Sequence, residues 1–219
     1  MIETSSRKPA VIIGAGGHAR VVAAAVAAGD EWHAVCVLDT DPSSIGEQIL
    51  GVEVEGTLDG LSELAEKGIG AAFLASGNGE TRAKWAKLCE DAGINLPALI
   101  HPSAVVDPSA KIGDGSMVCA GVVIGPLAAL GQGVLINTNA SVDHESEVGD
   151  FATISPAVAV AGRCVIGQNA FLGIGSKISD RVTVGKDARV GAGAVALGDV
   201  AEGGFVTGIP ARPHSTGGD

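Results

Sequence analysis

The stretch IGPLAALGQGVLINTNASVDHESEVGD, residues 124–150, carries the pattern that decides the fold, because Ile, Val or Leu occupies every sixth position in it. The spacing holds without insertion over sixteen positions, namely Ile100, Val106, Ile112, Val118, Ile124, Leu130, Ile136, Val142, Val148, Ile154, Val160, Ile166, Leu172, Ile178, Val184 and Val190. The residue four places later is small or narrow at every repeat, as in Ala104, Ser116 and Cys164. Branched and small residues therefore alternate with the period of two of a strand, and a break every six residues predicts short strands joined by tight corners.

The corners between these strands are also visible in the sequence. Three residues after the repeated aliphatic position come residue types that tolerate positive φ, namely Gly115, Gly121, Gly133, Asn139, Asn169, Gly175, Asp187 and Gly193. A hexapeptide repeat of this kind predicts a parallel β-helix. It resembles the left-handed β-helix of the hexapeptide acyltransferases, in which three hexapeptides form one triangular coil. The resemblance implies that residues eighteen apart stack, giving about five coils and a prism ~25 Å tall at ~4.8 Å between strands.

The composition fits such a core and excludes several classes of protein. The chain has 219 residues, 33 of them glycine, and only 3% aromatic residues, which suits a core of stacked aliphatic side chains. A net charge of −11 argues against nucleic-acid binding. We find no apolar run of about 18 residues and no secretory leader, and the four cysteines lack metal-ligand spacing. We therefore expect a reduced, cytoplasmic protein with no membrane partner.

The first hundred residues alternate between strand-like and helix-like segments. Strands are predicted at residues 9–13, 34–38, 71–75 and 96–100, and helices at residues 20–28, 58–67 and 80–92. This order is typical of a small Rossmann-like α/β domain with a parallel sheet.

The first of these strands runs into the turn GAGGHA, residues 14–19, which fits the dinucleotide fingerprint GxGxxA. A strand, a glycine-rich turn and a helix in that order form a helix N-terminus that can hold a phosphate. The second strand ends in Asp39, about where a ribose-binding acid is expected. Three interpretations stay open: a nucleotide-sugar or related phosphate ligand, a dinucleotide, and a purely structural turn. The small size of the domain argues against the dinucleotide.

Three motifs make a family resemblance specific: VIIGAGGHARVV at residues 11–22, VLD at 37–39 and ASGNGETR at 75–82. With the unbroken hexapeptide repeat, they resemble the bacterial sugar-nucleotide amino-sugar N-acetyltransferases, which are grouped with the sialic-acid O-acetyltransferases. The resemblance implies a Rossmann-like nucleotide-sugar-binding domain (residues 1–97), a left-handed β-helix acyltransferase domain (98–205), and a C-terminal closing segment and tail (206–219). It assigns nucleotide-sugar binding to Gly14, Gly16, Gly17, His18, Asp39, Gly77 and Asn78.

His144 is the candidate catalytic residue. It lies two residues after a repeated aliphatic position, hence at an outward-facing corner, with Asp143 and Glu145 on either side and Asn137 one strand upstream. A sugar amine that attacks a thioester must lose a proton, and imidazole is well matched to accept it near pH 7. The resemblance makes His144 a general base and gives Glu145 the position of the acid that raises its basicity, with Asp143 as a competing candidate. No Ser or Cys nucleophile is required, so we expect direct acyl transfer.

The resemblance also implies that acetyl-CoA, the expected co-substrate, binds along the β-helix. Thr153 stands where the best-matched members of the family carry a second His that faces acetyl-CoA, so a contact from its hydroxyl is a separate expectation. The other candidates match pantetheine-lining positions or could pair with the phosphates: Gly173, Ile174, Ala192, Lys177, Lys186 and Arg189. Residues 208–212 resemble the family's closing motif, and residues 213–219 are predicted to form a tail.

The predicted function is acetyl-CoA-dependent N-acetylation of a nucleotide-linked 4-amino-4,6-dideoxy sugar by a homotrimer that needs no metal. The alternative within the family is O-acetylation of a sialic-acid-like sugar. A γ-type carbonic anhydrase would need three histidine ligands at a subunit interface, whereas the coils offer only His101 and His144. A non-catalytic binding module predicts that His144→Ala leaves function unchanged. UDP-sugars and GDP-sugars stay equally open.

Overall fold

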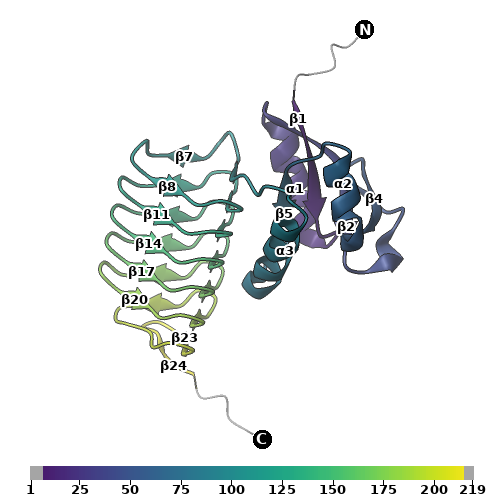
Figure 1. Cartoon of the computed structure of the whole chain (residues 1–219). Coiled ribbons are helices and arrows are strands. Elements are labelled where there is room, and N and C mark those ends of the chain that lie inside the picture. Colours follow the sequence, from purple (N-terminus) through teal and green to yellow (C-terminus); the bar gives the residue numbers. More distant parts are fainter. Residues whose placement is uncertain (1–6, 215–219) are drawn as a thin grey trace, which may run out of the picture.

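The computed structural model describes residues 7–214 and shows an N-terminal α/β domain beside a β-helix (Figure 1). The helices and strands of the first domain are β1 (Lys8–Ile13), α1 (Gly17–Ala28), β2 (Trp32–Asp39), the 3₁₀ helix η1 (Pro42–Ser44), β3 (Gln48–Ile49), β4 (Val52–Thr57), the 3₁₀ helix η2 (Leu58–Gly60), α2 (Leu61–Glu66), β5 (Ala72–Leu74) and α3 (Gly79–Asp91). Its sheet has the order β3-β4-β2-β1-β5. Because β1 pairs in parallel with β2 and β5, their carboxyl ends meet at one edge, next to the glycine-rich turn.

Both faces of this sheet are covered, which explains the continuous apolar run of β1. Ala10 and Ile12 pack on the side of α1, in the same cluster as Val22. Ile13 packs on the other side with Trp85 of α3. A strand buried on both faces has no polar alternation, so the sequence predicted this strand well.

Two parts of the domain differ from the sequence-based prediction. The antiparallel hairpin of β3 and β4 was not predicted; it extends the sheet beyond β2, and β3 is only two residues long. Residues 96–100 were expected to form the last strand of this sheet. That expectation is wrong, because only β6 (Leu99–Ile100) is a strand there, and it pairs with the β-helix instead.

The β-helix is built from short strands at the hexapeptide spacing. They are β6 (Leu99–Ile100), β7 (Val105–Val106), β8 (Lys111–Ile112), β9 (Met117–Val118), β10 (Val123–Ile124), β11 (Ala129–Leu130), β12 (Leu135–Ile136), β13 (Ser141–Val142), β14 (Glu147–Val148), β15 (Thr153–Ile154), β16 (Ala159–Val160), β17 (Val165–Ile166), β18 (Phe171–Leu172), β19 (Lys177–Ile178), β20 (Thr183–Val184), β21 (Arg189–Val190) and β22 (Val195–Ala196). The antiparallel pair β23 (Phe205–Thr207) and β24 (Arg212–Pro213) closes the last coil.

Residues eighteen apart pair in parallel, as predicted: Val123 pairs with Ser141, and Ser141 with Ala159. The three resulting sheets are the three faces of a prism. We call them the domain face (β6, β9, β12, β15, β18, β21, β23, β24), the small-residue face (β7, β10, β13, β16, β19, β22) and the polar face (β8, β11, β14, β17, β20). The repeated aliphatic residues point inward and are buried from Val118 onward, whereas Ile100, in the first coil, stays 42% exposed.

The corners adopt the left-handed backbone that the sequence predicted at Gly115 and Asn139, with φ of 69° and 57°. The same conformation occurs at corner positions where the sequence gives no glycine, including Glu145 and Arg163, both at φ 57°. Stacking supports this uncommon conformation, because the corner N–H groups bond to the preceding coil, mostly to a carbonyl, as from Arg163 N–H to His144 O at 2.9 Å, and at Gly121 and Leu127 to a serine hydroxyl.

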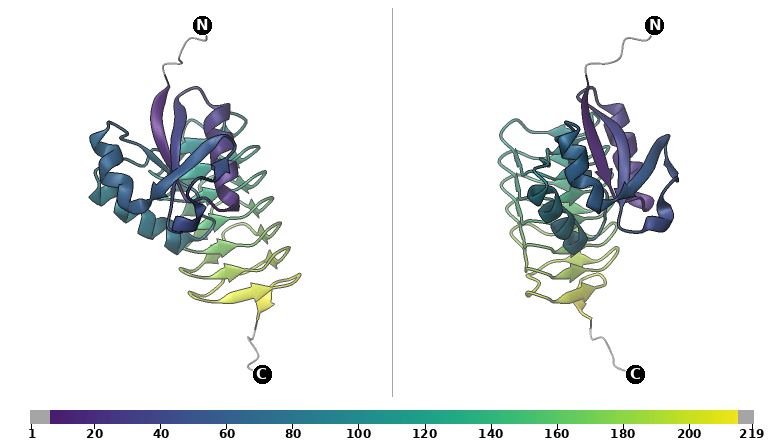
Figure 2. Two further views of the ribbon diagram at one scale, coloured as in Figure 1. Left: turned by 90° about the vertical axis from the view of Figure 1, so that its right-hand side faces the viewer. Right: turned by 45° about the vertical axis from the view of Figure 1, so that its right-hand side comes forward.

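The N-terminal domain lies against the domain face, and the C-terminal coils extend beyond it (Figure 2). Gly79 at the start of α3 lies close against the β-helix. A Cβ on this residue would collide with the side chain of Asn169 and the carbonyl of Phe151, both at the corner where the polar face meets the domain face. Glycine is therefore required at this position by the packing of the two domains.

Candidate active site

His144 lies at the corner between β13 and β14, where the small-residue face meets the polar face; we call this edge the His144 corner. Its side chain is 40% exposed, as the sequence predicted for an outward corner. The ring Nδ1 lies 3.1 Å from Glu145 Oε2. Asp143 instead accepts a hydrogen bond from the backbone N–H of His144, at 2.7 Å. Of the two flanking acids, Glu145 therefore contacts the imidazole, while Asp143 hydrogen-bonds to the backbone of the corner.

The contact with Glu145 determines which ring nitrogen can accept a proton. A carboxylate at Nδ1 favours the tautomer that carries its hydrogen there, which leaves the lone pair of Nε2 free. The hydrogen bond from His144 and the positive charge of Arg163 lower the pKa of Glu145, so it is ionised at neutral pH. The arrangement can accept a proton at Nε2 and stabilise the imidazolium through Glu145.

Two residues in the next coil, which sequence reasoning missed, complete the His144 corner. Gly162 lies eighteen residues after His144, and a Cβ on it would collide with the imidazole ring. Arg163 follows it, and its Nη2 lies 2.9 Å from Glu145 Oε2. The eighteen-residue stacking rule, applied to the corners as well as to the core, would have found both.

The glycine-rich turn of the N-terminal domain is open where a ligand could approach. A Cβ on Gly16 or Gly17 would meet no heavy atom within 4 Å, so packing does not explain these glycines. Gly14 is different, because its φ is 106° and a Cβ would approach the ring of Trp85 to 2.8 Å. α1 starts at Gly17 with no side-chain cap, so no side chain accepts from the N–H groups of its first turn.

His18 and Asp39 lie on either side of this turn. Burial, with a further contribution from the positive charge of Arg82, lowers the pKa of His18 to about 4, so the imidazole is neutral at pH 7. Its Nε2 is buried and has no hydrogen-bond partner among the described residues. Asp39 accepts hydrogen bonds from the N–H groups of Ala15 and Asp41, so its carboxylate ties the end of β2 to the turn.

The second loop of the domain, at Gly77 and Asn78, leads directly into the β-helix. Asn78 caps α3, because its side chain accepts a hydrogen bond from Thr81 N–H at 2.8 Å. The Gly77 carbonyl accepts a hydrogen bond from the Thr153 hydroxyl at 3.1 Å. The same hydroxyl accepts a hydrogen bond from Arg82 Nη2 at 3.0 Å. Thr153, only 4% exposed, therefore joins the two domains.

A cleft of about 470 Å³ lies beside this junction, between the start of α3 and the domain face. Four of the sequence-predicted site residues line it: Gly77, Asn78, Thr153 and Arg189. The guanidinium of Arg189 lies 4.8 Å from the centre of the Phe171 ring, which holds this cation at the mouth of the cleft.

The remaining candidates for acetyl-CoA binding lie mostly along one further edge, where the domain face meets the small-residue face; we call it the Asn137 corner. Asn137 stacks above Gly173 two coils away, and Ile174 and Ala192 stack beside them, both exposed. Lys177 projects from the adjoining small-residue face. Lys186 lies at the third edge, next to Asp187, and is not brought together with the others.

Each of the two domains matches a known protein family. Residues 10–88 match the family described as the PglD N-terminal domain, and residues 163–198 match the bacterial transferase hexapeptide (six repeats). A search of curated protein sequences finds no significant match. A perosamine N-acetyltransferase variant from Caulobacter crescentus, in complex with CoA and GDP-perosamine, is 39% identical, with 96% of this chain and 97% of that chain covered and a TM-score of 0.91.

The chain belongs to the hexapeptide-repeat sugar N-acetyltransferases. The acetyltransferase domain of PglB from Neisseria gonorrhoeae, in complex with acetyl coenzyme A, is 36% identical, with 95% and 100% of the two chains covered and a TM-score of 0.88. WeeI from Acinetobacter baumannii is 26% identical, with 94% and 100% covered and a TM-score of 0.83. The predictions of the family, of the fold and of an acyltransferase are confirmed.

The four cysteines of this acetyltransferase are poor nucleophiles. All are buried, and burial raises the pKa of Cys36 and Cys89 to about 11 and that of Cys119 to about 12. Burial also raises the pKa of Cys164, whose Sγ lies 3.0 Å from the carbonyl of Ser179. A thiol is a nucleophile only when ionised, so this chemistry favours transfer without an acyl-cysteine intermediate.

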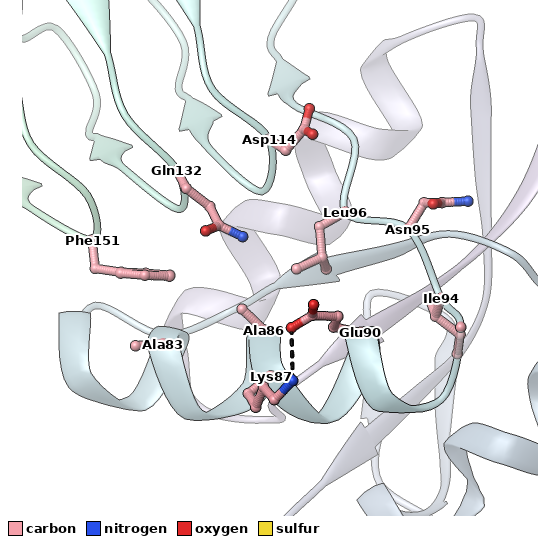
Figure 3. A pocket seen from close by; sticks show the side chains of 11 residues that line it. Ala83, Ala86, Lys87, Glu90, Ile94, Asn95, Leu96, Asp114, Gln132 and Phe151 are labelled. Atoms are coloured by element: carbon pink, nitrogen blue, oxygen red, sulfur yellow. Dashed lines mark hydrogen bonds and ion pairs between the residues drawn. The ribbon is translucent and has the colours of Figure 1, made fainter.

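A second cleft of the acetyltransferase is lined by none of the predicted site residues. This cleft of about 500 Å³ lies between α3 and the corner formed by Asp114, Gln132 and Phe151, and Lys87 in it pairs with Glu90 at 3.0 Å (Figure 3). Within residues 7–214 we find no group of three or more His, Cys, Asp or Glu side chains that could hold a metal ion. None of the helices in that range is long and apolar enough to cross a bilayer.

Proposed function

We propose that this acetyltransferase transfers the acetyl group of acetyl-CoA to the amino group of a nucleotide-linked 4-amino-4,6-dideoxy sugar. The observation that carries the proposal is the 3.1 Å contact between His144 and Glu145 at an exposed corner, in a chain 39% identical to a perosamine N-acetyltransferase bound to CoA and GDP-perosamine. GDP-perosamine is therefore the first substrate to test, with UDP-linked amino sugars second.

In the proposed reaction His144 is the general base. The sugar nitrogen attacks the thioester carbonyl, and its proton passes to Nε2 of His144 while Glu145 stabilises the imidazolium. The tetrahedral intermediate then collapses, the carbon–sulfur bond breaks, and the imidazolium returns the proton to the departing thiolate. The products are the N-acetylated sugar and CoA with a free thiol. A backbone N–H meets the oxyanion of the intermediate.

The nucleotide-sugar is proposed to bind at the carboxyl edge of the N-terminal sheet. Gly16 and Gly17 leave room for the phosphates at the start of α1, where the helix dipole favours an anion. The neutral ring of His18 can hydrogen-bond to the phosphates or sugar through its unpartnered Nε2. Gly14 shapes the turn, and Asp39, which lies at the end of β2, faces the nucleoside end. Gly77 and Asn78 complete the site from the neighbouring loop.

Acetyl-CoA is proposed to lie along the Asn137 corner. The exposed residues Ile174 and Ala192 can bind the amide-rich pantetheine arm, and the buried Gly173 lets the coils stack closely beneath them. Asn137 stands in the same column nearer the reacting group. Lys177, Lys186 and Arg189 stay candidate partners for the phosphates, and Arg189 is the best placed because it borders the cleft that also holds Gly77 and Thr153.

We further propose a homotrimer with the active site between subunits. In one chain the His144 corner lies opposite the domain face, so His144 is on the far side of the prism from the nucleotide turn. The small-residue face is bounded on one side by the His144 corner and on the other by the Asn137 corner. Three such faces turned toward a threefold axis would place the His144 corner of each chain beside the Asn137 corner of its neighbour.

The outward side chains of the small-residue face fit this arrangement. They are Val105, Val123, Ser141, Ala159, Lys177 and Val195. Val105 is 64% and Val123 47% exposed in the single chain, so an apolar strip lacks cover that a partner would supply. We place the reaction in the cytoplasm, since four free cysteines suit a reducing compartment, and we propose that it needs no metal.

The test is a thiol-release assay with purified protein, acetyl-CoA and a panel of GDP-perosamine, UDP-linked 4-amino sugars and a sialic acid. We expect a nucleotide-linked amino sugar to release thiol, and His144→Ala to reduce the rate at least ~10²-fold, as for loss of a general base. His33→Ala is the matched control, because His33 is exposed on β2 and bonds to the Arg7 carbonyl. Turnover of the sialic acid alone would support O-acetylation instead.

A further inference from the structure

We propose that Arg163 is a positioning residue that holds the carboxylate of Glu145 against the ring of His144. The inference deepens the proposed function and rests on it, because it assigns a role within that reaction. Arg163 lies outside the motifs that carry the family resemblance.

The geometry places two donors on one carboxylate oxygen. Arg163 Nη2 lies 2.9 Å from Glu145 Oε2, and His144 Nδ1 lies 3.1 Å from the same atom. The Glu145 side chain is 44% exposed, so without a second partner it can rotate toward water. A guanidinium on the outer side of the oxygen restricts that rotation and leaves the inner side for the imidazole.

The stacking of the β-helix brings Arg163 to this position. It is eighteen residues after Glu145, and both residues share the left-handed corner conformation with φ of 57°. The backbone N–H of Arg163 donates to the carbonyl of His144 at 2.9 Å, which fixes the two coils in register. The neighbouring Gly162 leaves the space that the imidazole ring occupies.

The other charged groups at this corner are engaged elsewhere. Asp143 accepts a hydrogen bond from the N–H of His144 at 2.7 Å. Arg181, one coil below Arg163, pairs with its neighbour Asp180 at 2.8 Å. The positive charge of Arg163 also lowers the pKa of Glu145, after the larger effect of the His144 hydrogen bond, and so supports its ionised form.

A substitution at this position can be made without changing the corner. Ala157 occupies the equivalent place in the preceding hexapeptide, at the Asn137 corner, with φ of 58°, so Arg163→Ala fits the backbone. Arg163→Lys keeps the positive charge but loses the planar guanidinium group with its fixed N–H donors. Arg181→Ala is the matched control, because it removes an arginine from the same column that does not touch Glu145.

Steady-state kinetics with acetyl-CoA and GDP-perosamine test the proposal. We expect Arg163→Ala to lower kcat about tenfold, the scale of a small misplacement of a catalytic group, with both KM values within about twofold of wild type. Arg163→Lys should recover part of the loss, and Arg181→Ala should match wild type. In a Glu145→Ala background, Arg163→Ala should have no further effect, because the two residues act as one unit.

Three kinetic results would overturn the proposal while leaving the proposed function intact. The first is wild-type kcat in Arg163→Ala. The second is a raised KM for the nucleotide-sugar at unchanged kcat, which would make Arg163 a substrate contact. The third is an additive loss in the double variant.

A second readout does not depend on turnover. The ¹⁵N chemical shifts of the His144 ring report its tautomer; we expect the Nδ1–H form in the wild type and a shift toward Nε2–H in Arg163→Ala. The same tautomer in both proteins would contradict the proposal. If no amino sugar is acetylated but the tautomer shifts, then the assigned reaction fails while the positioning by Arg163 stands.

Discussion

Arg82 and Thr153 lie 3.0 Å apart across the junction of the two domains, from guanidinium Nη2 to hydroxyl Oγ1. The guanidinium also donates to the carbonyls of Gly133, Ser76, Phe151 and Ala152. It is 2% exposed, and burial lowers its pKa to about 10, so it stays charged at neutral pH. This one side chain of α3 therefore ties the loop at Ser76 to the domain face of the β-helix.

Removing this arginine should weaken the junction. We expect Arg82→Ala to lower the free energy of unfolding by about 2–4 kcal/mol, because several buried carbonyls lose a charged donor. Urea unfolding monitored by tryptophan fluorescence checks this, since Trp85 lies on the same helix. Lys87→Ala is the control, because its ion pairs with Glu90 and Asp91 are exposed and should contribute less than about 1 kcal/mol. Equal stability of the two variants would contradict this role for Arg82.

The hydroxyl of Thr153 should matter more than its methyl group. Thr153→Val keeps the shape but removes one acceptor of Arg82 Nη2 and the hydroxyl that donates to the Gly77 carbonyl, which we expect to cost about 1–3 kcal/mol. Thr153→Ser keeps the hydroxyl and should retain most of the stability. The same unfolding measurement compares the two, and a more stable Val than Ser variant would show that packing, not hydrogen bonding, decides this position.

Gly162 should be needed for activity but not for folding. Gly162→Ala places a Cβ against the imidazole of His144, so we expect kcat to fall at least about tenfold through displacement of the base. Gly198→Ala is the matched control, two coils further along the same corner, where a Cβ would meet nothing within 4 Å. Circular dichroism of both variants should match the wild type, and full activity in Gly162→Ala would contradict the placement of the ring.

His18 should make the protein less stable as the pH falls. Its pKa is about 4 in the folded chain and 6.5 ordinarily, so between these values the unfolded chain binds more protons and stability rises with pH. At about 1.36 kcal/mol of unfolding free energy per pH unit, the folded protein should lose roughly 3 kcal/mol of stability between pH 6.5 and pH 4. His18→Gln should remove this part of the pH dependence in urea unfolding, whereas His33→Gln should not. If the free energy of unfolding depends on pH in the same way in the wild type and in His18→Gln, the prediction is wrong.

The proposed trimer can be tested on two faces of the same prism. Val123→Arg places a charge on the small-residue face, and Val165→Arg places one on the polar face at an equivalent strand position with similar exposure, 43% against 47%. Light scattering should give three times the 21.6 kDa chain mass for the wild type and for Val165→Arg. Val123→Arg should dissociate and lose activity. Dissociation by Val165→Arg alone would place the interface on the polar face.

Most of the fold could be predicted from the sequence because a β-helix repeats one local rule. The hexapeptide repeat that places Val142 inside also places His144, two residues later, at a corner and therefore outside, and corner glycines mark the turns. The hairpin of β3 and β4 escaped prediction, since two residues are too few to show a period. Asn78 could have been read as a helix cap, because Asn is a preferred residue just before a helix.

The sequence predicted a site residue only where that residue belongs to a recognised motif or to a defined position of the hexapeptide repeat. The choice between Asp143 and Glu145 needed side-chain directions, which the sequence does not contain. Arg82 was missed because most of its partners lie in the other domain, and no local pattern encodes how two domains pack. The glycine-rich turn was recognised, but the engagement of Asp39 with Ala15 N–H depends on how β2 ends in space.

The most direct test of the account is the product formed from acetyl-CoA and GDP-perosamine by the wild type and by His144→Asn, identified by mass spectrometry and NMR. The account predicts one acetyl group on the sugar nitrogen with the wild type, and at least ~10²-fold less product with His144→Asn under the same conditions. A variant that forms this product at the wild-type rate would contradict it, as would an acetyl group found on a sugar oxygen.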